Sequence, residues 1–218
     1  MSAWVGNRQR PFDQGVTSQR VRDAVGVVPE SVRILLALLG DGVQLTPGGR
    51  LPRVVVRAVQ ERRPDWYPLD RPVSIEEDLY PQATLHDILR HVRLLRLANG
   101  VLRPTKAAGD ETEIVRRLRS WFAPQGFSTM VAERAVALLD AHGPMEVPQL
   151  SLEVFGRLGR GWQRGGEPVT AHDVKRELHR LSGQLQALDL ITATRSPWHP
   201  GPSARSLLPG ATLLAGLV

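Results

Sequence analysis

An Asn-Gly pair at positions 99 and 100 is the feature that most constrains the local fold of this chain. A two-residue type I′ hairpin turn needs positive φ at both central residues, and Asn followed by Gly accepts this readily. Short apolar runs flank the pair, Leu94 to Leu97 before it and Val101-Leu102 after it. The sequence therefore predicts a small β-hairpin at this point.

The segment before this hairpin has the periodicity of a helix. From Ala83 onward, apolar residues recur three or four positions apart, which is the spacing of one helical face. These residues are Leu85, Ile88, Leu89, Val92 and Leu95. After the hairpin, Thr105 is placed to cap a further helix by accepting a hydrogen bond from a free backbone N–H. A helix, a hairpin and another helix form the second half of a winged-helix unit, so we expect that architecture.

The residues upstream supply the first half of such a unit. A helix is predicted to begin at Ser31 and to end at Gly40, because glycine is the preferred residue just after a helix. A short strand follows at Val43 to Leu45. Thr46 and Pro47 then have the pattern of an N-cap and a first helical proline, which predicts a second helix.

The same order of elements recurs in the second half of the chain, from Thr129 onward. The predicted features are a helix ending at His142-Gly143, a short extended segment at Met145 to Val147, a helix after Pro148, a long helix capped by Thr170 and Asp173, a strand at Leu190 to Thr194 and a long wing tip at 195–205. A chance pattern would rarely recur in the same order. We therefore predict a duplicated unit.

The predicted fold class is mainly α with small β-hairpins, arranged as two tandem winged-helix-like units. Residues 1–30 are expected to form an N-terminal arm. Residues 31–122 form the first unit, which ends in a bridging helix around Ile114 to Phe122, and residues 123–218 form the second.

Composition excludes several classes of protein. The chain has 218 residues, of which 42% are hydrophobic, so it can bury a real core. It has no cysteine, which excludes disulfides and thiolate metal sites and favours a reducing compartment. No apolar run approaches the ~18 residues of a membrane-spanning helix. We expect a cytoplasmic protein with no membrane partner, and the sequence sets no oligomeric state.

The residue patterns that carry enzyme chemistry are missing from this sequence. His172 and His179 are two helical turns apart, but no third ligand stands at zinc spacing. No Gly-x-Ser-x-Gly elbow occurs, and no Gly-Lys-Ser/Thr follows the glycine-rich segment 159–166. We therefore expect no enzyme activity, no catalytic residue, no metal and no cofactor.

Positive charge is the strongest functional signal. Lys and Arg number 28 against 22 Asp and Glu, a net charge of +6, and all but two of the basic residues are arginine. A GC-rich genome also produces such a composition, so only the distribution of the charge is informative. Between Arg90 and Lys106 there are five Arg or Lys residues and no acidic one, with His86 upstream on the expected outer face.

Two groups of basic residues lie where a winged-helix protein would contact DNA. The first basic set, on the third helix and hairpin of the first unit, is Arg90, Arg93, Arg103 and Lys106. The second basic set, on the long helix of the second unit, is Lys175, Arg176 and Arg180. In winged-helix proteins the third helix can enter the major groove while the wing contacts phosphate or the minor groove.

Three interpretations of these sets stay open. The first is a non-enzymatic protein that associates with double-stranded DNA, mainly through phosphate contacts. The second is a docking module for a protein partner, because winged-helix units also serve as adaptors. The third is that the arginines only solvate the outer faces of amphipathic helices.

Two motifs carry a resemblance to a known family. GDGVQLTPGGRLP, from Gly40 to Pro52, and LLRLANGVLRPTKAAG, from Leu94 to Gly109, resemble a region of actinobacterial proteins that are similar to the third open reading frame of an agrobacterial plasmid. The resemblance covers roughly Val32 to Leu214. It implies a helical module of winged-helix character, and it implies no activity.

The helical faces make a prediction about stability. We expect Leu89, Val92, Leu118, Trp121, Leu178, Leu181 and Leu185 to be buried. Truncating any one of these leucines to alanine should lower the free energy of unfolding by about 2–5 kcal/mol, as in well-packed cores. Urea denaturation measures this loss, and losses below ~0.5 kcal/mol at several positions would contradict the assigned faces.

Overall fold

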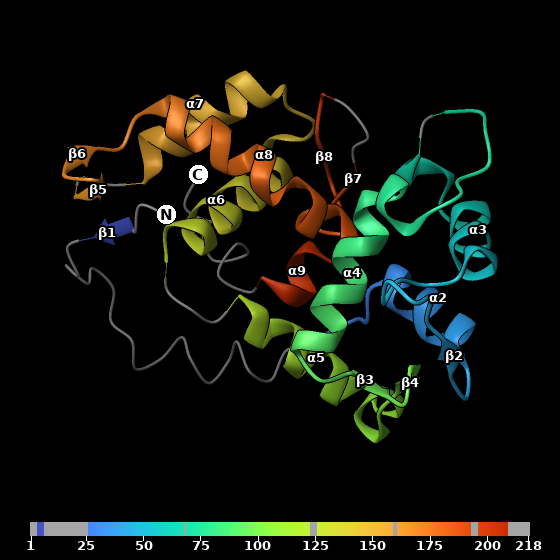
Figure 1. The fold of residues 1–218 in the computed structure, drawn as a ribbon. Coiled ribbons are helices and arrows are strands. Elements are labelled where there is room, and N and C mark those ends of the chain that lie inside the picture. Colours follow the sequence, from blue (N-terminus) through green and yellow to red (C-terminus); the bar gives the residue numbers. More distant parts are fainter. Residues whose placement is uncertain are drawn as a thin grey trace.

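The computed structural model describes residues 4–6, 26–67, 69–122, 126–158, 161–192 and 196–208. Within these residues the protein is mainly α-helical, with small antiparallel pairs of strands, as the sequence predicted (Figure 1). No helix in these ranges is long and apolar enough to cross a membrane. Most of the expected N-terminal arm, the joint between the expected units at 123–125 and the C-terminal segment 210–218 lie outside the described residues.

The first half contains the helices and the hairpin that the sequence predicted. Its elements are α2 (Glu30–Leu39), β2 (Val43–Gln44), α3 (Arg53–Arg62), two 3₁₀ turns η1 (Pro64–Trp66) and η2 (Glu76–Asp78), α4 (Tyr80–His91), β3 (Leu95–Ala98) and β4 (Val101–Pro104). The strand order is β2-β4-β3. Asn99 and Gly100 have φ values of 51° and 75°, so the predicted turn with two positive φ angles is confirmed.

Two predicted helix caps in this half are wrong. Helix α3 begins at Arg53, so Thr46 does not cap it, and the Thr46 hydroxyl accepts instead from the Arg50 N–H within a tight loop. Gly49 in this loop has φ of 75°, which is incompatible with a helix. Thr105 precedes only a 3₁₀ turn, η3 (Lys106–Gly109), and its hydroxyl donates to the Arg93 carbonyl.

The helix expected around Ile114 is helix α5 (Glu111–Trp121). Its cap is Asp110, whose side chain accepts from the N–H groups of Thr112 and Glu113. An acidic N-cap suits the positive end of a helix dipole.

The second half has four helices and two short hairpins in its described residues. Its elements are α6 (Phe127–His142), α7 (Val147–Arg157), β5 (Trp162–Arg164), β6 (Glu167–Pro168), α8 (Ala171–Ala187), β7 (Ile191–Thr192), β8 (His199–Pro200) and α9 (Ala204–Leu207). Strand β1 (Trp4–Gly6) pairs antiparallel with β5. Thr170 and Asp173 form the predicted capping box at the start of α8.

The long wing expected at 195–205 is wrong in its extent. Strand β8 already pairs with β7 at His199–Pro200, and Trp198 exchanges two backbone hydrogen bonds with Met145. Helix α9 then begins at Ala204, inside the expected wing. Beyond the pair of Pro200 with Ile191, the N–H groups of Gly201 and Ser203 still donate to the carbonyls of Leu190 and Asp189.

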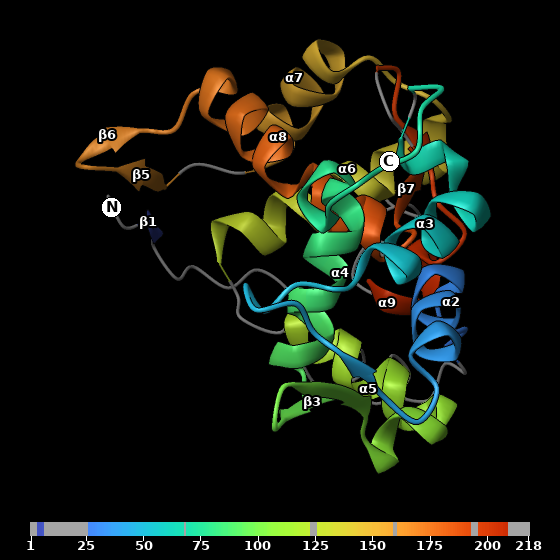
Figure 2. The same cartoon turned by 45° about the vertical axis from the view of Figure 1, so that its right-hand side comes forward.

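One hydrophobic core runs through both halves of the chain. Helix α4 packs against α8, and the two helices lie side by side in both views (Figures 1 and 2). Gly183 allows this contact, because a Cβ atom there would come within 2.1 Å of the Tyr80 ring. All of the predicted core residues are buried except Trp121, which is half-buried with its ring against that of His91.

Asp189 connects the two halves through a buried carboxylate. It is 2% exposed, and its Oδ2 accepts from the Ser31 N–H at the start of α2 at 2.9 Å. Its Oδ1 accepts from Arg63 Nη1, and the Ser31 hydroxyl donates to the Ala187 carbonyl at 2.7 Å. Asp189 therefore caps a helix that lies 158 positions away and neutralises a nearly buried guanidinium.

This contact leads to a stability prediction. Replacing Asp189 by Asn keeps a residue that tolerates its left-handed backbone but removes the charge that Arg63 faces. Breaking a buried pair in this way should cost about 3–5 kcal/mol in urea denaturation. The matched control is Asp65→Asn, because Asp65 is a half-exposed partner of the same guanidinium and should cost only about 0–1 kcal/mol. Equal losses in the two variants would contradict the role given to Asp189.

Candidate nucleic-acid interface

The first basic set lies around one end of the first half. Arg90 is in the last turn of α4, Arg93 follows its end, Arg103 is in β4 and Lys106 opens η3. All four side chains are exposed, and none of them forms an ion pair with a described residue. The carboxylates of the described chain therefore do not neutralise this group.

The hairpin adds a fifth basic side chain that the site assignment from sequence missed. Arg96 stands directly opposite Arg103 across β3 and β4, and it is also exposed. Like charges directly opposite each other destabilise a strand pair, so an anion bound between them would relieve their repulsion. Alternation along the two predicted strands could have identified this pair, because the turn sets the register.

Gly42 provides the space that Arg103 needs. A Cβ atom at Gly42 would lie 2.5 Å from the Cγ atom of Arg103, and its φ of 134° also favours glycine. The stem of Arg103 therefore lies over the backbone of Gly42 beside strand β2. This contact fixes the base of the side chain while its guanidinium stays exposed.

Helix α4 ends with Arg93 in a left-handed conformation. Its φ is 59°, and the Leu94 N–H bonds back to the Leu89 carbonyl at 2.8 Å. Glycine or asparagine usually occupies such a position, because a β-carbon is strained there. The backbone thus places an arginine where the fold alone would favour a smaller residue.

Helix α5 brings two further arginines to this end of α4. Arg117 Nη1 donates to the Arg93 carbonyl at 2.9 Å and to the Val92 carbonyl at 3.3 Å. Glu113 accepts from both Arg116 and Arg117, at distances of 2.6 to 2.7 Å. A hollow of about 320 Å³ lies between these helices, lined by His91, Val92, Arg93, Arg116, Arg117 and Ser120.

His86 does not belong to this surface, contrary to the sequence-based expectation. It is 1% exposed, and its Nδ1 lies 2.9 Å from Oε1 of the buried Glu76. Helix α4 is buried on more than one face, so polar residues beside its apolar stripe, such as Gln82 and His86, are also buried. The Glu76 Oε2 also accepts from the Leu51 N–H, so this pair ties α4 to the start of α3.

The second basic set differs in its charge environment. Arg176 pairs with Asp173 at 2.6 Å, and Arg180 pairs with Glu177 and also donates to the Ser128 hydroxyl. Lys175 is half-buried. Two of the three cations are thus neutralised by carboxylates three positions earlier on the same helix, a spacing that was readable from sequence.

The structure does not bring the two basic sets together. Helix α8 begins beside the β5–β6 hairpin at the top of the molecule, whereas β3 and α5 lie at its bottom (Figures 1 and 2). The second basic set belongs to the first three turns of α8 and therefore lies away from the β3–β4 hairpin. A single flat surface containing both sets is not formed.

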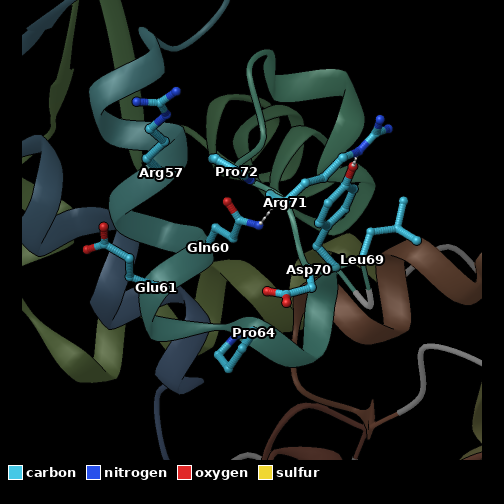
Figure 3. Close-up of a pocket in the computed structure, with 9 residues that line it drawn as sticks. Arg57, Gln60, Glu61, Pro64, Leu69, Asp70, Arg71 and Pro72 are labelled. Carbon is cyan, nitrogen blue, oxygen red and sulfur yellow. Dashed lines mark hydrogen bonds between the residues drawn. The ribbon is translucent and has the colours of Figure 1, made fainter.

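A larger depression lies between α3 and the segment that follows it, and it has a different chemistry. It has a volume of about 650 Å³, and Gln60 reaches from α3 to donate to the Arg71 carbonyl at 2.9 Å (Figure 3). Its lining carries Arg57 and Arg71 against Glu61 and Asp70. These charges balance, so the depression does not select an anion or a cation by its field.

The described residues contain no group of three or more His, Asp or Glu side chains arranged to hold a metal ion. His172 and His179, which share a face of α8, are both exposed. Within the described residues, the basic surface around the end of α4 and the β3–β4 hairpin gathers five exposed cations, and it is the candidate site.

Comparison of the chain with protein-family models, with curated proteins and with solved structures gave no match. The resemblance to the actinobacterial proteins stays a prediction.

The pairing of Glu113 leads to a prediction about pH. Hydrogen bonds from Arg116 and then Arg117 lower the pKa of Glu113 from 4.5 to about 2. Because the pKa is lower in the folded state, the pairing contributes its full stabilisation above pH ~4.5. This stabilisation is lost as the pH falls through about 2. NMR titration of the Glu113 carboxyl carbon should find it ionised at pH 3. In Arg116→Ala its pKa should rise, and a wild-type midpoint near 4.5 would show that the pairs do not form.

Proposed function

We propose that this protein is a non-enzymatic, double-stranded-DNA-associated protein that binds the phosphate backbone. The contact surface consists of the first basic set together with Arg96. One observation carries the proposal: these five cations lie within 17 consecutive positions, are exposed, and form no ion pair with a described residue. Unneutralised positive charge of this density favours a polyanion as the partner.

We further propose that the two halves are tandem winged-helix-like units. Supporting this, α2, β2, α3, α4, β3 and β4 follow one another with the strand order β2-β4-β3, which suits a winged-helix unit. In the second half, α6, α7, α8, β7 and β8 follow in a similar order, with Met145 bridged to Trp198 near β8. The β3–β4 hairpin then acts as the wing that meets phosphate.

The packing of α4 determines the kind of DNA contact in this proposal. Its first turn lies against α8 at Gly183, so that end is occupied by the protein itself. The exposed arginines stand at the other end of α4 and on the hairpin. Contacts from these positions reach the backbone of the duplex, and they carry little sequence information.

Protein docking is the second candidate, and a separate surface favours it. Leu152 and Phe155 stand three positions apart on α7, and their side chains are 61% and 41% exposed. An exposed apolar pair on one helical face can contribute to a docking surface. This candidate places the contact on α7 and not on the basic surface.

A DNA titration tests the first candidate. Binding of a short mixed-sequence duplex, followed by fluorescence anisotropy, should weaken with salt at a log–log slope of about −0.9 per phosphate neutralised. Replacing Arg96 and Arg103 together by Ala should lower the affinity for all duplexes alike and flatten this slope by about two.

The matched control is the double variant Arg157→Ala and Arg176→Ala. It removes the same amount of charge, but each of these exposed arginines pairs with a carboxylate on its own helix. Its affinity should stay at the wild-type value. Equal weakening by both double variants would mean that only net charge matters. The docking candidate predicts a different result. The wild type would bind no duplex at low salt, and it would co-purify with a stoichiometric protein partner that Leu152→Asp no longer retains.

A further inference from the structure

Helices α4 and α8 end with the same backbone geometry but with opposite charges. After α4, Arg93 has φ of 59° and the Leu94 N–H bonds to the Leu89 carbonyl at 2.8 Å. After α8, Asp189 has φ of 54° and the Leu190 N–H bonds to the Leu185 carbonyl at 2.8 Å. Each helix end is followed directly by the first strand of a hairpin.

Neither residue is the one that this backbone conformation prefers. A side chain in the left-handed region costs free energy relative to glycine, and such strain persists where the side chain serves another purpose. For Asp189 the purpose is internal, because its carboxylate binds the Ser31 N–H and Arg63. The Arg93 side chain is exposed and makes no ion pair with a described residue. Its guanidinium is therefore available to a ligand.

The hollow beside Arg93 has the charge of an anion site. Arginines 93, 116 and 117 line it, together with His91, Val92 and Ser120, and none of these six lining residues is a carboxylate. Glu113 pairs with two of the three guanidiniums, so three positive charges stand against one negative charge. The formal balance around the hollow is positive.

The end of a helix would normally repel an anion, because its free carbonyls carry partial negative charge. Here Arg117 donates to the carbonyls of Val92 and Arg93, and the Thr105 hydroxyl donates to the Arg93 carbonyl as well. These hydrogen bonds neutralise the C-terminal end of α4. They also hold the backbone from which the Arg93 side chain extends.

We propose that this hollow binds one backbone phosphate of duplex DNA, with Arg93 as the direct contact and Arg117 as a positioning residue. This inference rests on the proposed function and names a site within it. Phosphate fits because two of its oxygens can accept together from the planar fork of one guanidinium. Arg93 is also only three positions before Arg96, so the site continues the basic surface of the hairpin.

The decisive variant is Arg93→Gly, because it relieves the left-handed strain while it removes the guanidinium. We expect its melting temperature to be equal to or above that of the wild type. Its affinity for a mixed-sequence duplex should fall about eightfold at 0.1 M salt, and the salt slope should flatten by about one, as for one lost phosphate contact. If Arg93 were only structural, its replacement would lower the melting temperature together with the affinity.

Asp189→Gly is the matched control at the corresponding position. It also places glycine at a left-handed position, where aspartate is better tolerated than arginine. It removes a carboxylate that the fold uses, so its melting temperature should fall. A loss of stability in Arg93→Gly like that in Asp189→Gly would overturn the inference, because Arg93 would then serve the fold.

The outcomes separate this inference from the proposed function. If Arg96→Ala with Arg103→Ala weakens duplex binding and Arg93→Gly does not, DNA association stands and the phosphate site is rejected. If the wild type binds no duplex, both fail. Titration with inorganic phosphate, followed through the arginine Nε–H signals, tests the source of the anion. Shifts of Arg93 with inorganic phosphate, without competition by the duplex, would reject the DNA backbone as the ligand.

Discussion

The buried carboxylate of Asp189 is the contact on which the arrangement of the two halves depends. A charge removed from water needs a partner of opposite charge and hydrogen bonds for its oxygens. Asp189 finds both in the first half, in the N–H of Ser31 at the start of α2 and in Arg63 at the end of α3. The end of α8 is thereby joined to two helices at once, and α4 and α8 pack side by side within one core.

The same local geometry has contrasting consequences at the ends of α4 and α8. After α8 the left-handed position holds Asp189, and its buried carboxylate joins the two halves. At α4 it carries an arginine, which the fold leaves exposed beside a hollow of positive charge. A similar contrast separates the two basic sets. Arg176 and Arg180 are paired within α8, whereas the cations around β3 and β4 have no ion-pair partner among the described residues. The basic surface that we propose for DNA therefore belongs to the first half.

Part of the candidate site could be predicted from the sequence, and the remainder could not. The run from Arg90 to Lys106 contains no acidic residue, so its charge was readable directly. Arg116 and Arg117 were missed because they belong to a separate helix, and only the packing of α5 brings Arg117 to the carbonyls at the end of α4. His86 was misplaced because its burial depends on Glu76, which comes from the segment before α4.

The sequence by itself determined the features whose energy comes from near neighbours. The turn at Asn99-Gly100, the capping box of Thr170 and Asp173, and the apolar faces of α4 and α8 all depend on residues within a few positions of one another. The tertiary structure decided which charges are paired and which helices meet. Asp189 and Ser31 are 158 positions apart, and no local pattern encodes a contact over that distance. Contacts between distant segments leave no periodic pattern in the sequence, because they form only when those segments come together.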